Sequence, residues 1–343
     1  MMKTVLQRGL AIAMTLSIAA GVFANGQQGA ESSSSSQAAS GAVLIGIAQF
    51  LQHPALDQCQ QGVQDAVKAR GIEATYDVQN ANGDPSTAAQ IANKYKGENV
   101  AVAVGIATPI AQAMVNAMPT TPVVFSAVTD PVGAGLVQSN DTGDAYCTGA
   151  SDAIPTQANI KLFGDIAKIK TLGYIYCNAE ANSVYELANV EEGAKAAGMT
   201  LVTQTVNTTA DVRQAAQSIV SRVDGLYLST DNTVYGAIAA VIDVFRQAKK
   251  PIFAGDATGV MDGGCMVASG SNYYKLGIAT GNIVADIIQG KKCSDIPVKF
   301  ATEASEMDFL VDLDAAANCG ITISQKYIDD ATMIFQNGKL TTK

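Results

Sequence analysis

The stretch IGIAQFLQHPALDQCQQGVQDAVKARG, residues 45–71, decides the fold. It begins with an apolar run, which is typical of a buried parallel strand. A polar break that contains His53, the only histidine of the chain, separates this run from residues with helical apolar spacing. A proline follows His53 and Gly71 ends the helical run, as expected at the two ends of a helix. The stretch therefore predicts a β-strand, a polar loop and an α-helix.

The same alternation recurs along the rest of the chain. The predicted strands cover residues 42–48, 73–78, 100–106, 122–128, 144–150, 171–177, 200–206, 225–230 and 251–256. Helical periodicity separates them at 54–70, 85–95, 109–117, 156–167, 183–197, 209–221 and 232–248. Such alternation predicts parallel sheets with right-handed crossovers. About 300 residues are enough for two domains, so we predict an α/β fold with two doubly wound, Rossmann-like lobes.

The first 24 residues have the pattern of a secretory signal peptide. Lys3 and Arg8 precede an apolar run, and residues 22–24 fit a cleavage site. An uncleaved anchor is the alternative, although an apolar run of about 14 residues is short for a membrane span. Residues 25–41 form a serine-rich stretch that predicts a flexible leader. No lipid-anchoring cysteine is present before Cys59, so we expect an exported, periplasmic or extracytoplasmic protein without a lipid anchor.

Charge and cysteine content limit the possible partners. The formal net charge is -9, and it becomes more negative once the two basic residues of the signal peptide are removed. This acidity argues against DNA, RNA and anionic membrane surfaces as partners. The six cysteines have wide, irregular spacings without a CxxC motif, so no metal site is expected. Disulfides are possible in an exported protein, and the sequence does not choose among the pairings.

The polar loops that follow the predicted strands are the candidate ligand site. In open α/β sheets, ligands bind outside the carboxyl ends of the strands. These loops cover residues 49–54, 107–109, 126–131, 178–183, 229–233 and 255–259. The helix N-termini in these loops would suit the carboxylate of a ligand, and four acidic side chains in the loops would suit a ligand ammonium group. Each acid also has a simpler role as a helix cap: Asp130, Glu180, Asp231 and Asp256.

Sequence motifs for catalysis are missing. No GxSxG, HExxH, GxGxxG or phosphate-binding loop follows a predicted strand. A triad of His53 with Ser126 and Asp130 lacks a nucleophile elbow. A carboxylate pair made of Asp231 and Asp256 would suit glycoside hydrolysis, but loop acids are common. We therefore expect a protein that is not an enzyme and that uses no cofactor.

Several stretches together resemble one family. Besides residues 45–71, these stretches are QNANGDPSTAAQIANKY, GIATPIAQA, VVFSAVTDPVGAGLV, LGYIYCNAEANSV, GLYLSTDNTV and SNYYKLGIATGNIVADIIQGKK. From residue 43 to about 336 the chain is similar to the TrpX-like group of ABC transporter substrate-binding proteins. The resemblance implies a type I periplasmic-binding-protein fold, in which a hinge joins two lobes around a ligand. The segment GDATGVMDGGC, near Asp256, is less typical of the family.

The resemblance also implies how the chain is divided. Lobe 1 would contain residues 42–142 and 264–297, and lobe 2 would contain 143–263 and 298–343. The implied ligand-binding residues are Gln49, Phe50, His53, Thr108, Ser126, Thr129, Asp130, Glu180, Ser183, Asp231, Asn232 and Asp256. Asp231 and a second acid would bind the ligand ammonium, and Thr108, Ser126 and backbone N–H groups its carboxylate. Phe50 would stack on an aromatic ligand or simply pack in the core.

The implied function is that of a binding subunit for import. A monomer would capture a small solute, close around it and dock on the permease subunits of an ABC transporter. Amino acids, aromatic ones first, are the expected ligands, with sugars and nucleosides as alternatives. A ligand sensor for a membrane receptor and an exported enzyme are further alternatives. His53 then lines the cleft, or only begins the helix before Pro54.

Overall fold

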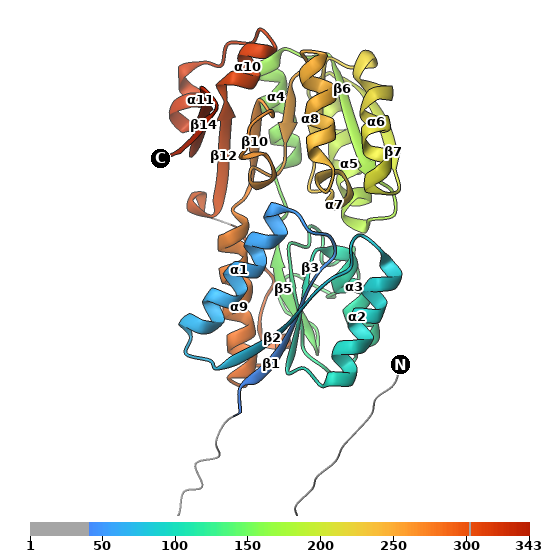
Figure 1. Cartoon of the computed structure of the whole chain (residues 1–343), viewed down its shortest axis with the longest axis vertical. Helices are drawn as coiled ribbons and strands as arrows, with labels where there is room; N and C mark the ends of the chain where they lie inside the picture. The colour runs from blue at the N-terminus through green and yellow to red at the C-terminus, as the bar shows by residue number, and fades with distance from the viewer. Residues whose placement is uncertain (1–40, 302) are drawn as a thin grey trace, which may run out of the picture. The chain divides into compact units, whose positions relative to one another are not determined.

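The computed structural model describes residues 41–301 and 303–343, which form two β-sheets covered by helices (Figure 1). The first sheet is parallel throughout, with the order β11-β5-β4-β3-β1-β2. Its strands are β1 (Val43–Gln49), β2 (Ala74–Asn80), β3 (Val102–Ile106), β4 (Val123–Ser126), β5 (Cys147–Ser151) and β11 (Lys299–Phe300). Four helices cover it: α1 (Pro54–Ala69), α2 (Pro85–Glu98), α3 (Thr108–Ala117) and α9 (Tyr273–Ile288).

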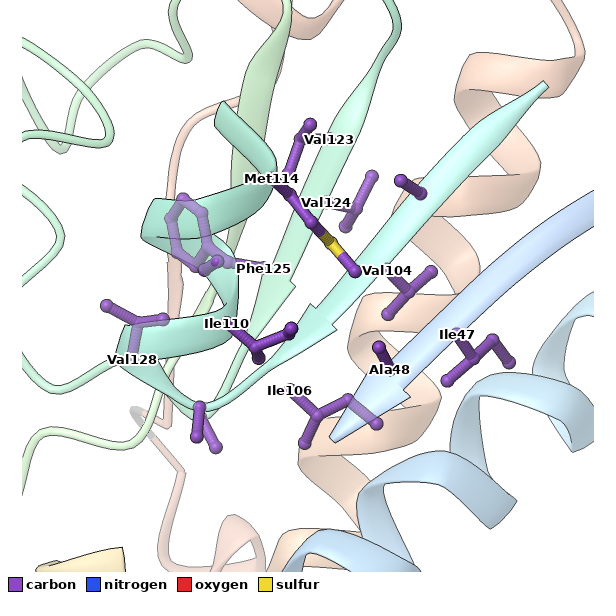
Figure 2. Packing of buried hydrophobic residues seen from close by; sticks show 14 of the residues in the cluster. Ile47, Ala48, Val104, Ile106, Ile110, Met114, Val123, Val124, Phe125 and Val128 are labelled. Atoms are coloured by element: carbon purple, nitrogen blue, oxygen red, sulfur yellow. The ribbon is translucent and has the colours of Figure 1, made fainter. Parts of the chain in front are cut away.

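Apolar strands and helices enclose the core of this first lobe. Strand β3 is buried along its whole length, as expected for a central parallel strand. Figure 2 shows Val104 and Ile106 of β3 and Phe125 of β4, together with Ile110 and Met114 of α3. All five belong to one cluster of buried apolar side chains. This core holds the carboxyl ends of the parallel strands at a common edge.

The second sheet has the order β14-β13-β12-β10-β9-β8-β6-β7. Its strands are β6 (Thr171–Cys177), β7 (Thr200–Val206), β8 (Gly225–Leu228), β9 (Ile252–Ala254), β10 (Val267–Ser271), β12 (Met307–Asp312), β13 (Met333–Gln336) and β14 (Lys339–Thr342). Strand β12 is antiparallel to β10, and β14 is antiparallel to β13. The helices are α4 (Thr156–Ala167), α5 (Ala181–Ala196), α6 (Val212–Ile219), α7 (Asn232–Tyr235), α8 (Ile238–Gln247), α10 (Leu313–Asn318) and α11 (Gln325–Asp330). Short 3-10 helices lie at η1 (Thr209–Asp211), η2 (Val220–Arg222), η3 (Thr258–Val260), η4 (Cys293–Asp295) and η5 (Ala304–Glu306).

The prediction of two doubly wound α/β lobes is confirmed, but the sheets do not divide at the expected residues. Strand β5 pairs with β4 in the first sheet, although residues from 143 onward were expected in the second lobe. Strand β10 pairs with β9 in the second sheet, and β11 with β5 in the first. No helix separates β4 from β5 among the described residues. Because the described residues between β4 and β5 form no helix, the alternation of strands and helices is interrupted there. The sequence pattern therefore predicted β5 as the first strand of the second lobe.

Two other expectations concern the N-terminal region and one predicted helix. The signal peptide at 1–24 and nearly all of the leader at 25–41 lie outside the described residues. Within 41–301 and 303–343, no helix is both long and apolar enough to cross a membrane. The helix predicted at 232–248 is two helices, because the helical conformation is interrupted between α7 and α8 at Gly236 and Ala237.

Candidate functional site

Polar loops from both sheets meet around a small cavity of about 10 Å³. This volume is roughly the lower limit for one ordered water molecule. The lining residues are His53, Leu56, Asp152, Thr230, Asp231, Asn232, Tyr235, Asp256 and Tyr273. Larger hollows of about 250 and 720 Å³ lie beside α8 and α10 and beside α4 and α5. We place the site at the small cavity because buried ionisable side chains converge there.

Asp231 caps α7 and is buried among hydrogen-bond donors. One carboxylate oxygen accepts from the Val234 N–H at 2.8 Å. The other accepts from the Cys177 N–H at 2.6 Å and the Ser183 hydroxyl at 2.7 Å. Burial raises the Asp231 pKa to about 7, and the nearby charge of Glu180 acts in the same direction. The side chain is therefore a helix cap whose ionised form is disfavoured by burial.

Asp256 follows β9 and is also almost fully buried. Its carboxylate accepts from the N–H groups of Thr258 at 2.7 Å and Gly259 at 3.3 Å. Burial raises its pKa to about 7, and the charge of Asp152 adds to this shift. The Tyr235 hydroxyl fixes the loop, since it accepts from the Asp256 N–H at 2.9 Å and donates to the Asp256 carbonyl at 3.3 Å.

Asp152 is the third acid, and the sequence analysis missed it. It follows β5 and accepts from the Thr129 hydroxyl at 3.0 Å and from the Tyr273 hydroxyl at 2.9 Å. Burial raises its pKa. The rule that pointed to Asp231 and Asp256, an acid directly after a parallel strand, also applies to Asp152. It was overlooked because β5 was taken as the first strand of a new lobe.

The three aspartates give the cavity an unbalanced negative charge. No lysine or arginine is among the described residues that line it. Burying a carboxylate without a cation costs free energy, and the raised pKa values express that cost. The arrangement suits a ligand group that brings positive charge and several hydrogen-bond donors.

His53 lines the cavity from the loop between β1 and α1. Its Nε2 lies 3.5 Å from the Asn232 side-chain oxygen, and its ring centroid lies 6.0 Å from that of Tyr235. Burial lowers the His53 pKa to about 4. The Asn232 amide nitrogen donates to Glu180 at 2.5 Å, so the amide oxygen faces His53. Nε2 therefore carries the proton, and Nδ1, which has no described partner, is a hydrogen-bond acceptor.

Glu180 holds the N-terminus of α7 and does not face the cavity. Its carboxylate accepts from the Thr233 N–H at 3.0 Å and from the Thr233 hydroxyl at 2.7 Å. The bond from Asn232 uses the other oxygen. Glu180 thus fixes the Asn232 amide that orients His53, and its contribution to the site is indirect.

The remaining predicted residues fall into two groups. Thr129 and Ser183 bond to cavity aspartates, and Thr129 also lies 3.1 Å from the Thr230 hydroxyl, between the two sheets. Neither Thr129 nor Ser183 lines the cavity itself, and the other five predicted residues neither line it nor have a described hydrogen bond to its aspartates: Gln49, Phe50, Thr108, Ser126 and Asp130.

Those five have other surroundings. Gln49 donates to Asp57 at 3.0 Å and Gln60 at 2.9 Å. Phe50 belongs to the core of the first lobe. Thr108 is buried at the start of α3, with a hydroxyl that has no described partner. Ser126 accepts a hydrogen bond from Thr280 at 2.9 Å, and Asp130 accepts one from the Gly133 N–H at 3.0 Å.

Ser126 and Asp130 therefore do not form a triad with His53. Besides Asp152, the sequence analysis missed four lining residues: Leu56, Thr230, Tyr235 and Tyr273. Thr230 lies in one of the predicted site loops, residues 229–233, next to Asp231. Tyr235 and Tyr273 lie inside helical segments and left no comparable signal.

The chain is similar to known proteins over most of its length. The family model of the ABC transporter substrate binding protein matches residues 44–334. A tyrosine-binding protein from Clostridioides difficile (strain R20291) is 33% identical over 275 residues, which are 79% of each chain.

Two solved structures are also similar. The ABC domain in complex with L-Trp from Streptococcus pneumonia is 29% identical, with a TM-score of 0.81 over 86% of this chain and 100% of that chain. The ligand-free, open structure of a substrate binding protein with adhesive properties from Clostridium difficile is 32% identical, with a TM-score of 0.62 over 82% and 96%. The chain therefore belongs to the family of ABC transporter substrate binding proteins, which bind substrates and are not enzymes.

Proposed function

We propose that this protein binds an amino acid, preferably an aromatic one, between its two lobes. The observation that carries the proposal is the convergence of Asp152, Asp231 and Asp256 on one cavity without a lysine or arginine in its described lining. A ligand ammonium would supply the missing positive charge and three hydrogen-bond donors. Nδ1 of His53 is a further acceptor for a donor on the ligand.

The relatives support the choice of ligand class. One has tyrosine binding in its name and another was solved with L-Trp. The ligand carboxylate needs donors, and the Thr108 hydroxyl at the start of α3 is buried without a described partner. Ser126 is a poorer candidate for this role, since its hydroxyl is bonded to Thr280. We retain Thr108 and the neighbouring helix N-terminus for the carboxylate.

The arrangement of the lobes supports binding by closure. The structure is more similar to the L-Trp complex than to the ligand-free, open structure, although the open one is slightly more identical in sequence. Direct contacts between the lobes, such as Thr129 with Thr230, fit a closed form. A cavity of about 10 Å³ is too small for an amino acid, so the lobes separate to admit the ligand.

The wider role that we propose is import. The protein would be exported, act as a monomer and deliver its ligand to the permease subunits of an ABC transporter. Membership of the family and the signal-peptide pattern of the first 24 residues support this role. No cofactor or covalent chemistry is needed for it.

Calorimetry on refolded protein, stripped of any carried-over ligand, tests the ligand class. Tryptophan, tyrosine and phenylalanine would be titrated beside leucine and ribose. The chain has no tryptophan, so added tryptophan is also the only indole fluorophore. We expect saturable binding of an aromatic amino acid, and no binding of the corresponding compound that lacks the amino group.

Matched variants test the ammonium site. Asp152→Asn should weaken binding by about tenfold or more, because it removes one buried charge next to the ammonium. Asp130→Asn, at an acid that caps a turn outside the cavity lining, should leave the Kd unchanged. If no amino acid binds while circular dichroism shows intact folding, the ligand class is wrong.

A further inference from the structure

Two of the six cysteines lie near each other at the edge of the first sheet. Cys147 begins β5, and Cys293 begins η4, which follows α9. A Cβ atom at Gly143 would lie 2.1 Å from the Cys293 carbonyl oxygen and 2.9 Å from that of Cys147. The Thr148 hydroxyl also donates to the Ile296 carbonyl at 2.8 Å. The two backbone segments are therefore in direct contact.

The Cys293 thiol also affects the Cys147 thiol. Both side chains are buried. Burial raises the pKa of the Cys147 thiol, and the charge of a Cys293 thiolate raises it further. For the other four cysteines, the described groups that shift the pKa are carboxylates and hydrogen-bond partners, not another cysteine. Of the pairings that the sequence leaves open, only this one has support in the structure.

We propose that Cys147 and Cys293 form a disulfide bond when the chain folds in an oxidising compartment. This inference rests on the export that is part of the proposed function, but not on the identity of the ligand. All six cysteines are free thiols in this structure. In the reaction, a disulfide of a thiol oxidoreductase or of oxidised glutathione accepts two electrons and the two thiol protons, and one S–S bond forms in the protein.

The timing of the reaction follows from burial. The thiolate is the reactive form, and burial disfavours it at both positions; the Cys293 pKa is raised to about 11. Exchange is therefore fast only before β5 and η4 are packed together. A folded, reduced protein should oxidise slowly.

The bond would link the start of β5 to the segment that precedes β11. Strand β5 leads directly to Asp152 of the cavity, and η4 leads into β11, which pairs with β5. After β5 and after β11 the chain crosses to the second sheet. A link between Cys147 and Cys293 would lie at the start of β5, at the opposite end of this strand from Asp152, and would hold together the two segments that lead to the crossings.

Mass spectrometry on two preparations tests the proposal. Residues 25–343 would be isolated from an oxidising periplasm, and also refolded in a glutathione redox buffer. Each sample would be denatured and alkylated without reductant. We expect four of the six cysteines to be alkylated, and a non-reduced digest to contain one cross-linked pair with Cys147 and Cys293. Alkylation of all six in both preparations, or a cross-link between other cysteines, would overturn the proposal. A bond in the refolded sample alone would also overturn it, because the periplasmic sample had folded in an oxidising compartment.

Variants separate the bond from simple packing. Cys147→Ala and Cys293→Ala should each lower the Tm of the oxidised protein by about 5 °C, and the double variant no further. Reductant should lower the Tm of the wild type towards the Tm of these variants. Cys177→Ala is the control, because its Tm shift should be equal with and without reductant. Equal shifts for Cys147→Ala in both conditions would contradict a disulfide.

Discussion

At the scale of the residue, His53 is a neutral side chain in a negatively charged cavity. Burial lowers its pKa to about 4, against smaller opposing effects of Asn232 and Asp57. An exposed histidine titrates near 6.5. The closed form therefore loses stability relative to an open form as the pH falls through 6.5, because closure must then remove a proton from His53.

Ligand affinity should follow this titration. We expect the Kd to rise by about tenfold between pH 7 and pH 5 in the wild type. His53→Gln keeps a polar side chain that does not titrate, so its Kd should change less than that of the wild type, and the remaining change would come from Asp231 and Asp256, whose pKa values are raised to about 7. Calorimetry at both pH values measures the difference. An equal loss of affinity in His53→Gln would assign the pH dependence to other groups.

Asp256 has the opposite effect on the unliganded protein. Its pKa is raised to about 7 in the folded state, so its contribution to stability is fully present below about pH 4 and is lost as the pH rises through 7. Asp256→Asn removes this charge. We expect the variant to be more stable than the wild type by about 1–3 kcal/mol at pH 8, and the gain to be smaller at pH 5.

Denaturant unfolding of the ligand-free protein at both pH values checks this prediction. Asp243→Asn, at a half-buried acid with arginine partners, is the control, and it should show no gain at pH 8. An Asp256→Asn variant that is less stable at pH 8 would show that the two N–H bonds to the carboxylate outweigh its burial cost.

At the scale of the element, α1 and α9 pack side by side at unusually close range (Figure 1). A Cβ atom at Gly277 would lie 2.3 Å from the Cys59 carbonyl oxygen, and one at Gly62 would lie 2.4 Å from the Tyr274 carbonyl oxygen. Both contacts are with backbone, which cannot rotate away. Glycine at these positions is what allows the two helices to approach.

Gly277→Ala should therefore destabilise the protein by about 2 kcal/mol or more, because the helices must move apart. Gly97→Ala is the matched control, since Gly97 is in α2 and no atom lies within 4 Å of its Cβ position. Alanine there should be neutral or stabilising by up to about 1 kcal/mol. Urea unfolding of both variants measures the difference, and equal effects would contradict the close-packing argument.

At the scale of the whole molecule, few contacts join the two lobes across the site. The Thr129 hydroxyl lies 3.1 Å from the Thr230 hydroxyl, and His53 Nε2 lies 3.5 Å from the Asn232 side-chain oxygen. A Cβ atom at Gly236, between α7 and α8, would lie 2.3 Å from the Leu51 Cδ2 atom of the first lobe. The break in the predicted helix at 232–248 thus lies where the lobes are in contact.

A larger side chain at position 236 should favour the open form. We expect Gly236→Ile to weaken ligand binding by about tenfold, which corresponds to about 1.4 kcal/mol against closure. Small-angle scattering with ligand should then show a larger radius of gyration than for the wild type. Adding Leu51→Ala should restore part of the affinity. A loss of affinity that Leu51→Ala does not change would point to damage within the second lobe.

The sequence alone determined the α/β class, the two lobes and most of the loops that carry the site. This was possible because buried strands, amphipathic helices and caps such as Asp84 leave a pattern within about ten residues. Asp231 and Asp256 were found by their place after a strand. The same signal did not show which acids share a cavity, so Asp130 was included and Asp152 was missed.

Tertiary structure decided the rest. It assigned β5 to the first sheet, turned Ser126 towards Thr280 and brought Tyr235 and Tyr273 next to the aspartates. Strand order and side-chain neighbours depend on contacts between residues far apart in the chain, and no local periodicity records them. The charge of the cavity exists only because loops from distant parts of the sequence converge on it.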